Sequence, residues 1–435
     1  MRVQPLLRDD VRPREFWAWA GYDFANSSYT TVVSTAVFNA YFVSTVYASD
    51  GWNTFAWTLA ISLAAALVMV AAPVAGALAD ARGRKKPFLA VATLLCVGGT
   101  LGLMAVGPGD VALALCLVMI SAVGFGLGES LIAAWLPLLG RSEALGRLSG
   151  YAWAIGYGGG LLALGMCLAY VQGAQSRGAP AEEYVAACMF ITAVFFALAA
   201  LPSFIWLKEH QAGAQPLARL GARAALDDAL ARLQRTWRES AAFVDLKRLL
   251  LAIVSYQAGV AAVVALAAIY AQEAMGFSTR DTLLLILLVN VTAAIGALGF
   301  GRLQDRIGHR AALMLSLAAW IVMVVLAWFA VQPWLFWIAA NFAGLAMGAS
   351  QSAGRALVGY LSPPDRVAEF FGLWGLAVRL STILGPISYG LVNLFTAGNH
   401  RLSMLWTGLF FVIGMLLVAR VDVARGHAQA QQRAS

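Results

Sequence analysis

Two short stretches of this chain, 225 residues apart, decide its fold: residues 76–86 read GALADARGRKK and residues 301–310 read GRLQDRIGHR. Both follow the pattern Gly-x-Leu-x-Asp-x-x-Gly and end in basic residues. The same offset also matches two pairs of glycines further along, Gly150 with Gly375 and Gly160 with Gly385. One offset that fits four of the predicted spans, two in each half, predicts two similar halves, and such repeats are common in secondary transporters.

The composition requires a membrane. Of 435 residues, 61% are hydrophobic and 12% are charged, and the mean hydropathy is +0.75. A soluble domain has about 25% charged residues. The four cysteines form no CxxC or Cys/His cluster, so we expect no metal site and no cofactor. The basic start runs into a long span with no cleavage site, so the first helix is expected to stay in the membrane.

A transmembrane helix needs about 20 mostly apolar residues. We count twelve such stretches, which predict an all-α integral membrane protein with two six-helix halves. The division within 320–345 is the weakest, because only Gln332 and Pro333 interrupt the apolar run. The stretches are 16–47, 53–79, 87–107, 111–139, 147–171, 184–207, 248–272, 281–301, 311–331, 333–360, 368–395 and 402–420.

The basic residues predict the orientation. Lys and Arg concentrate in cytoplasmic loops, and with both termini inside, 26 of the 30 basic residues fall on that side. The net charge of +8 therefore reports topology, and no nucleic-acid partner is needed to explain it. We predict a multi-pass protein of the cell (cytoplasmic) membrane.

The chain is expected to divide into an N-terminal half (1–207), a cytoplasmic linker (208–247) and a C-terminal half with a short tail (248–435). Leu226, Leu230, Leu233 and Trp237 repeat at helical spacing in the linker, with arginines around them. This pattern fits a basic amphipathic helix on the inner leaflet. A solvated tether between the halves fits it equally well.

The repeated loops are predicted to be gate elements. Each places an Asp where a helix leaves the membrane and a basic cluster after a tight turn, so that the charges can pair in one conformation and separate in another. Simple anchoring by positive charge is the alternative. The gate residues are Asp80, Arg84, Asp305 and Arg310.

These loops resemble the signature loop of the major facilitator superfamily. Three other stretches resemble the vacuole-effluxer, or "unknown major facilitator", family: residues 19–29 (WAGYDFANSSY), residues 147–160 (RLSGYAWAIGYGGG) and the segment from Gln351 through Arg379 to Pro386. The resemblance covers essentially the whole chain. It implies the superfamily's fold, alternating access and, for eukaryotic members, amino-acid efflux from a storage compartment. Arg379, Ser28 and the end of the fourth stretch depart from the family pattern.

Three ionisable residues stand out within the predicted membrane helices, where charge is costly unless it has a partner or a water-filled cavity. Arg379 is the main candidate, because its planar fork suits a carboxylate of a substrate or of the protein. Glu129 is a proton-coupling candidate, since a buried carboxyl can bind and release protons, or it makes a static hydrogen bond. Asp23 lies nearer the cytoplasmic end and is more simply structural.

Polar side chains on the first, seventh and tenth stretches are further candidates for substrate contact, because the first, fourth, seventh and tenth helices line the cavity in the superfamily that the chain resembles. Hydrogen bonding between helices is the competing use of each amide. The glycines at 156–160 are explained by close helix packing. The candidates are Asp23, Asn26 and Thr30, then Tyr256 and Gln257, then Asn341, Gln351 and Arg355.

We therefore predict a secondary transporter of a small polar solute, amino-acid-like or another zwitterion or anion, coupled to protons and acting as a monomer. One alternative is an exporter of amphiphiles or drugs on the same fold. Another is a non-transporting membrane scaffold or sensor. No catalytic constellation falls at membrane depth, so an enzyme is not expected.

Overall fold

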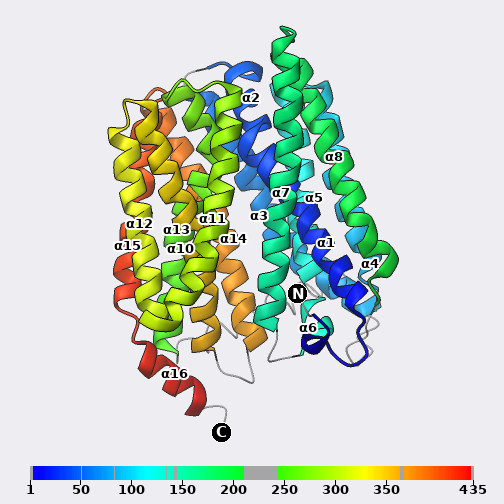
Figure 1. The fold of residues 1–435 in the computed structure, drawn as a ribbon, viewed down its shortest axis with the longest axis vertical. Helices are drawn as coiled ribbons and strands as arrows, with labels where there is room; N and C mark the ends of the chain where they lie inside the picture. The colour runs from blue at the N-terminus through cyan, green and yellow to red at the C-terminus, as the bar shows by residue number, and fades with distance from the viewer. Residues whose placement is uncertain are drawn as a thin grey trace. The chain divides into compact units, whose positions relative to one another are not determined.

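The computed structural model describes residues 3–49, 51–82, 84–133, 135–141, 145–209, 243–362 and 367–432 (Figure 1). All twelve predicted stretches are helical within these ranges, and the one β contact they contain is an isolated bridge between Leu7 and Gly140. The predicted all-α membrane fold is confirmed. The predicted amphipathic helix of the linker lies almost wholly at 210–242, outside the described residues.

The chain divides into two compact units. The first comprises Met1–Ala48 and Leu63–Ala229, and the second comprises Ser49–Ser62 and Leu230–Ser435. The helices from the first half of the sequence are α1 (Pro13–Tyr29), α2 (Phe38–Tyr41), α3 (Trp52–Arg82), α4 (Lys86–Gly102), α5 (Val111–Ala133), α6 (Leu136–Leu139), α7 (Leu145–Ser176) and α8 (Ala181–Trp206). Those from the second half are α10 (Val244–Ile269), α11 (Thr279–Ile307), α12 (His309–Phe329), α13 (Pro333–Leu361), α14 (Val367–Phe395), α15 (His400–Ala419) and α16 (Val423–Gln432).

The first predicted stretch, 16–47, is not one continuous helix. After α1 the chain takes π-helical turns at Thr30–Ala36 and Phe42–Val46, with α2 between them. The Val37 N–H donates to the carbonyl of Val32, five residues back, at 2.9 Å. β-Branched residues fill most of Thr30–Thr35, and they crowd the preceding turn of an α-helix. Similarly, the fourth stretch ends as α5 at Ala133 and resumes as the short α6, which has a proline in its first turn.

Ten helices among the described residues are long and apolar enough to cross a membrane. The two predicted stretches outside this set are the first, which is divided, and α13, which carries Asn341, Gln351 and Arg355. The weakest predicted division is confirmed, since α12 ends at Phe329 and α13 begins at Pro333.

The helix pairs show the duplication directly. In the first unit α1 packs on α7 and α8, and α4 packs on α5 and α8. In the second unit α10 packs on α14 and α15, and α12 packs on α13 and α15. The same four pairs therefore form in both units.

Glycines of α7 and α14 allow the closest of these contacts. A Cβ added at Gly159 would overlap the carbonyl oxygen of Phe24 in α1, and one added at Gly160 would lie 2.6 Å from Thr31 Oγ1. A Cβ at Gly385 in α14 would overlap the carbonyl oxygen of Ala258 in α10. Small residues let helix backbones approach closely in lipid, so the predicted packing role of the α7 glycines is confirmed.

We expect Gly385→Ala to destabilise the protein by about 1–3 kcal/mol, because the methyl group must push α10 and α14 apart. Gly375→Ala in the same helix is the control, since a Cβ there meets nothing within 4 Å. It should be neutral or stabilising by up to about 1 kcal/mol. Thermal unfolding of both variants in detergent measures the difference, and equal midpoints would contradict this account of the helix contact.

Candidate functional site

The candidate residues fall into two groups, one in each unit. Asp23 and Asn26 lie on α1, Thr30 begins the π-helical segment that follows it, and Glu129 lies on α5. The second group lies on α10, α13 and α14, and comprises Tyr256, Gln257, Asn341, Gln351, Arg355 and Arg379. The side chains of Asp23, Glu129, Arg355 and Arg379 are all half-buried.

Two predicted residues of the second unit contact each other directly. The amide of Gln257 in α10 donates from Nε2 to Oε1 of Gln351 in α13 at 3.0 Å, and Gln351 Nε2 lies 3.4 Å from Gln257 Oε1. Gln257 is buried at 5% exposure. An amide pair satisfies one donor and one acceptor on each side chain and leaves further hydrogen-bonding capacity on both.

Arg355 extends this polar group to α14. It follows Gln351 by one helical turn and so lies on the same face of α13. Its guanidinium carbon is 5.1 Å from the ring centroid of Trp374 in α14, within the range of a cation–π contact. Trp374 was not among the predicted site residues. Arg379 lies five residues further along α14, half-buried.

Two other predicted residues of this unit are used differently. Tyr256 is fully buried, and its hydroxyl lies against the backbone of Gly354 in α13, so that it packs α10 on α13. Asn341 donates from Nδ2 to the Trp337 carbonyl of its own helix at 2.8 Å. Asn341 also lies ten residues from Gln351, about 15 Å along α13. The structure therefore does not bring Asn341 to the amide pair.

The glycine contacts relate the two groups. In the first unit Gly160 lies against the carbonyl of Ser27, with 3.3 Å to an added Cβ, and in the second its repeat equivalent, Gly385, lies against the carbonyl of Ala258. The residue directly before each of these carbonyls is an amide, Asn26 in α1 and Gln257 in α10. Each of the two amides is therefore followed by a residue whose carbonyl faces a glycine of the neighbouring helix.

Asn26 differs from Gln257 in its hydrogen bonding. It is 6% exposed, and neither its side-chain nitrogen nor its oxygen has a hydrogen-bond partner among the described residues. Thr30 Oγ1 donates to the backbone carbonyl of Asn26 at 3.3 Å. A buried polar group without a hydrogen-bond partner costs about 1–3 kcal/mol, so Asn26 has hydrogen-bonding capacity that no other described residue uses.

Glu129 and Asp23 flank one crossing of helices. Tyr22 of α1 lies against Gly128 of α5, and its hydroxyl is 2.8 Å from Thr93 Oγ1 in α4. Asp23 and Glu129 each follow one of the two contacting residues in sequence. The contact between Tyr22 and Gly128 therefore places Asp23 and Glu129 next to the same helix crossing.

Each repeated loop is anchored near the end of the last membrane helix of its own unit, which is α8 in the first unit and α15 in the second. In the first unit the backbone N–H groups of Lys85 and Lys86 donate to the Glu209 carboxylate at 3.0 and 2.7 Å, and Lys86 Nζ donates to the Phe204 carbonyl at 2.8 Å. Lys86 begins α4, so Glu209 caps the N-terminus of that helix. Sequence reasoning counted the lysines and missed Glu209.

In the second unit the predicted gate residue Arg310 donates to the Ala419 carbonyl at the end of α15. Cations are favourable at helix C-termini, where carbonyls lack partners. Arg84 is exposed. The side chains of Asp80 and Asp305 lie outside the described residues, and their gate role remains a prediction.

Residues 53–431 match the family described as vacuole effluxer Atg22 like. The chain belongs to this family. A relative from Bacillus subtilis (strain 168), named uncharacterized MFS-type transporter YxiO, is 24% identical over 424 residues, which are 96% of each chain. Autophagy-related protein 22 of Yarrowia lipolytica (strain CLIB 122 / E 150) is 23% identical over 347 residues, 72% of this chain and 57% of that protein.

Solved transporters share the fold of this Atg22-like chain. A D-xylose-proton symporter superposes with a TM-score of 0.69 at 16% identity, covering 95% of this chain and 98% of the other. A single-residue mutant of the nucleoside transporter NupG gives 0.68 at 16% identity, covering 94% and 98%. The chain therefore has the major facilitator fold.

The amide pair of this Atg22-like protein should behave as a unit. Gln257→Leu or Gln351→Leu alone leaves the other amide buried with fewer hydrogen bonds, which should lower the free energy of unfolding by about 1–3 kcal/mol. The double variant removes both polar groups, so that neither amide is left without its partner. We expect the double variant to lose less stability than the sum of the singles in a thermal-unfolding cycle. Asn341→Leu is the control, because its amide bonds its own helix. Strictly additive losses would show that the pair does not stabilise the contact of α10 with α13.

Proposed function

We propose that this protein is a secondary transporter that moves a small anionic or zwitterionic solute across the membrane by alternating access, in exchange or symport with protons. The observation that carries the proposal is the polar group of the second unit. Gln257, Gln351 and the Arg355–Trp374 contact place amides, a guanidinium and an aromatic face on helices that are mostly apolar.

This chemistry suits a solute with a carboxylate. Guanidinium groups match carboxylates through two parallel N–H bonds, and Arg355 and Arg379 supply two such groups from adjacent helices of one unit. The amides can donate to a carboxylate or accept from an ammonium group. An amino-acid-like zwitterion uses both properties, whereas a neutral amphiphile uses neither.

Two further features support the rest of the proposal. Glu129, half-buried in α5, is a carboxyl at membrane depth, and intramembrane carboxyls serve as proton relays in pumps and transporters. The distribution of Lys and Arg supports a cytoplasmic location for both termini. We propose the cell membrane as the location and a monomer as the working form.

A thermal-shift screen tests the substrate class. Purified protein is screened with amino acids, dipeptides, organic acids, sugars and amphiphiles, beside Arg379→Ala and Arg379→Lys. A true ligand at 100 times its Kd should stabilise the wild type by about 2.7 kcal/mol. Arg379→Ala should lose most of that response, and Arg379→Lys should keep only part, since it retains the charge without the fork.

The control is Arg401→Ala, in which an arginine of the same unit that donates to the Trp328 carbonyl is removed. It should respond to ligand as the wild type does. A full ligand response in Arg379→Ala would show that Arg379 binds a protein carboxylate instead of the substrate. Stabilisation by amphiphiles alone would favour the drug-exporter alternative.

A further inference from the structure

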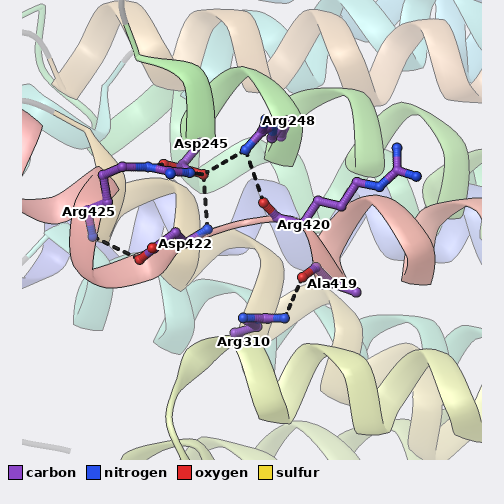
Figure 2. A network of polar contacts seen from close by, with 7 residues as sticks. All are labelled: Asp245, Arg248, Arg310, Ala419, Arg420, Asp422 and Arg425. Carbon is purple, nitrogen blue, oxygen red and sulfur yellow. Dashed lines mark hydrogen bonds and ion pairs between the residues drawn. The ribbon is translucent and has the colours of Figure 1, made fainter.

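The short helix after the last membrane helix is attached to the second unit by a buried carboxylate. Asp245, at the start of α10, is fully buried, and Figure 2 shows its polar contacts with neighbouring residues. It accepts hydrogen bonds from Arg425 Nε and Nη2 of α16 at 2.7 and 2.8 Å, and from the Asp422 N–H at 2.9 Å. Arg248, one turn along α10, lies 3.5 Å from the same carboxylate.

A second contact attaches α16 to the end of α13. The His427 ring stacks on the Tyr360 ring with centroids 4.1 Å apart and an interplanar angle of 10°, and Nδ1 donates to the Tyr360 carbonyl at 3.0 Å. Between the two contacts a Cβ added at Gly426 would lie 2.9 Å from Leu361 Cδ2 and 3.2 Å from the Asp245 Cβ. Helix α16 therefore touches the start of α10 and the end of α13 together.

These are the two helices that carry the amide pair. Gln257 follows Asp245 by twelve residues, about 18 Å along α10, and Gln351 precedes Tyr360 by nine, about 14 Å along α13. By fixing the spacing of the two helix ends, α16 also constrains how α10 and α13 can move about the Gln257–Gln351 contact. Asp245 and Arg425 are thus positioning residues for the candidate site.

Several features of the contact between α16 and the second unit favour reversible docking. Helix α16 has ten residues, fewer than the about 12–15 that an isolated helix needs to be stable in water. The Arg425 side chain is 49% exposed, so water competes for this ion pair. The Asp245 carboxylate raises the pKa of Arg425, which therefore keeps its charge. When α16 leaves, Arg248 still lies beside Asp245, so the carboxylate retains a cationic neighbour.

We propose that α16 is a releasable latch: docked, it holds the neighbouring ends of α10 and α13 together and slows their movement, and its release is a step of the transport cycle. The effect on transport rests on the proposed function, whereas reversible docking does not. The two parts can therefore be tested separately.

Hydrogen–deuterium exchange tests the docking without any substrate. In Arg425→Gln we expect the amides of α16 to exchange roughly tenfold faster, because local opening becomes easier, with α15 and the thermal midpoint unchanged. Arg420→Gln is the matched control, since Arg420 enters the network through its backbone carbonyl (Figure 2). Unchanged exchange of α16 in Arg425→Gln, or a general loss of stability, would overturn the latch.

A disulfide tests its effect on transport. Asp245→Cys with Gly426→Cys places two Cβ atoms 3.2 Å apart, slightly closer than the about 3.5–4.5 Å of native disulfides, in a background where the exposed Cys116 is replaced by Ser. In proteoliposomes loaded with the solute found by the thermal-shift screen, oxidation should slow solute exchange several-fold and dithiothreitol should restore it. An oxidised protein as fast as the reduced one would overturn control by α16. If the wild type showed no flux, the proposed transport function would fail, while the exchange data would still decide whether α16 docks reversibly.

Discussion

The contact on which the rest of this structure depends is the close approach of two helix backbones at glycines, made by the same helix pair in each unit. Gly159 and Gly160 seat α7 on α1, and Gly385 seats α14 on α10. In a bilayer no hydrophobic force draws helices together, so close packing must do so. Because a side chain at these positions would force the helices apart, the glycines fix the rotation and height of α1 and α10. Those two helices carry the buried amides Asn26 and Gln257.

The two units use the same arrangement for different chemistry. In the first, tyrosine hydroxyls bond across helices, Tyr22 to Thr93 and Tyr29 to Ser121 at 2.8 Å each, while Asn26 has no partner among the described residues. In the second, Gln257 bonds Gln351, and Arg355 covers Trp374. Duplication thus supplies the framework, and divergence at a few positions supplies the polar groups that we propose select a solute.

Much of this fold could be predicted from the sequence because the bilayer imposes simple rules on span length, apolarity and charge. The twelve stretches, the repeat and the packing role of the α7 glycines all follow from them. The breaks after Tyr29 could not be predicted, because they depend on local crowding of β-branched residues within a span that is still apolar. The site was predicted only as separate residues. Whether Gln257 meets Gln351 or, like Asn341, bonds its own helix is decided by helix rotation, which spacing alone does not fix.

The acids that hold the ends of the bundles were missed for a related reason. Glu209 and Asp245 lie in basic segments whose charge was attributed to topology, and each acts through contacts with residues distant in sequence: Glu209 with the start of α4, and Asp245 with α16. A short polar tail after the last span gives little reason to expect a docked helix. Its contacts are visible only once the ends of α10 and α13 are placed side by side.

The most direct test of the account is solute flux in proteoliposomes, with and without an imposed pH gradient, for the wild type and Glu129→Gln. Coupled transport predicts saturable exchange in both proteins and gradient-driven accumulation in the wild type only, because the variant keeps the proposed solute site but lacks the carboxyl proposed for proton coupling. A wild type that binds the solute without moving it would contradict the account and identify the protein as a scaffold or sensor with a transporter's fold.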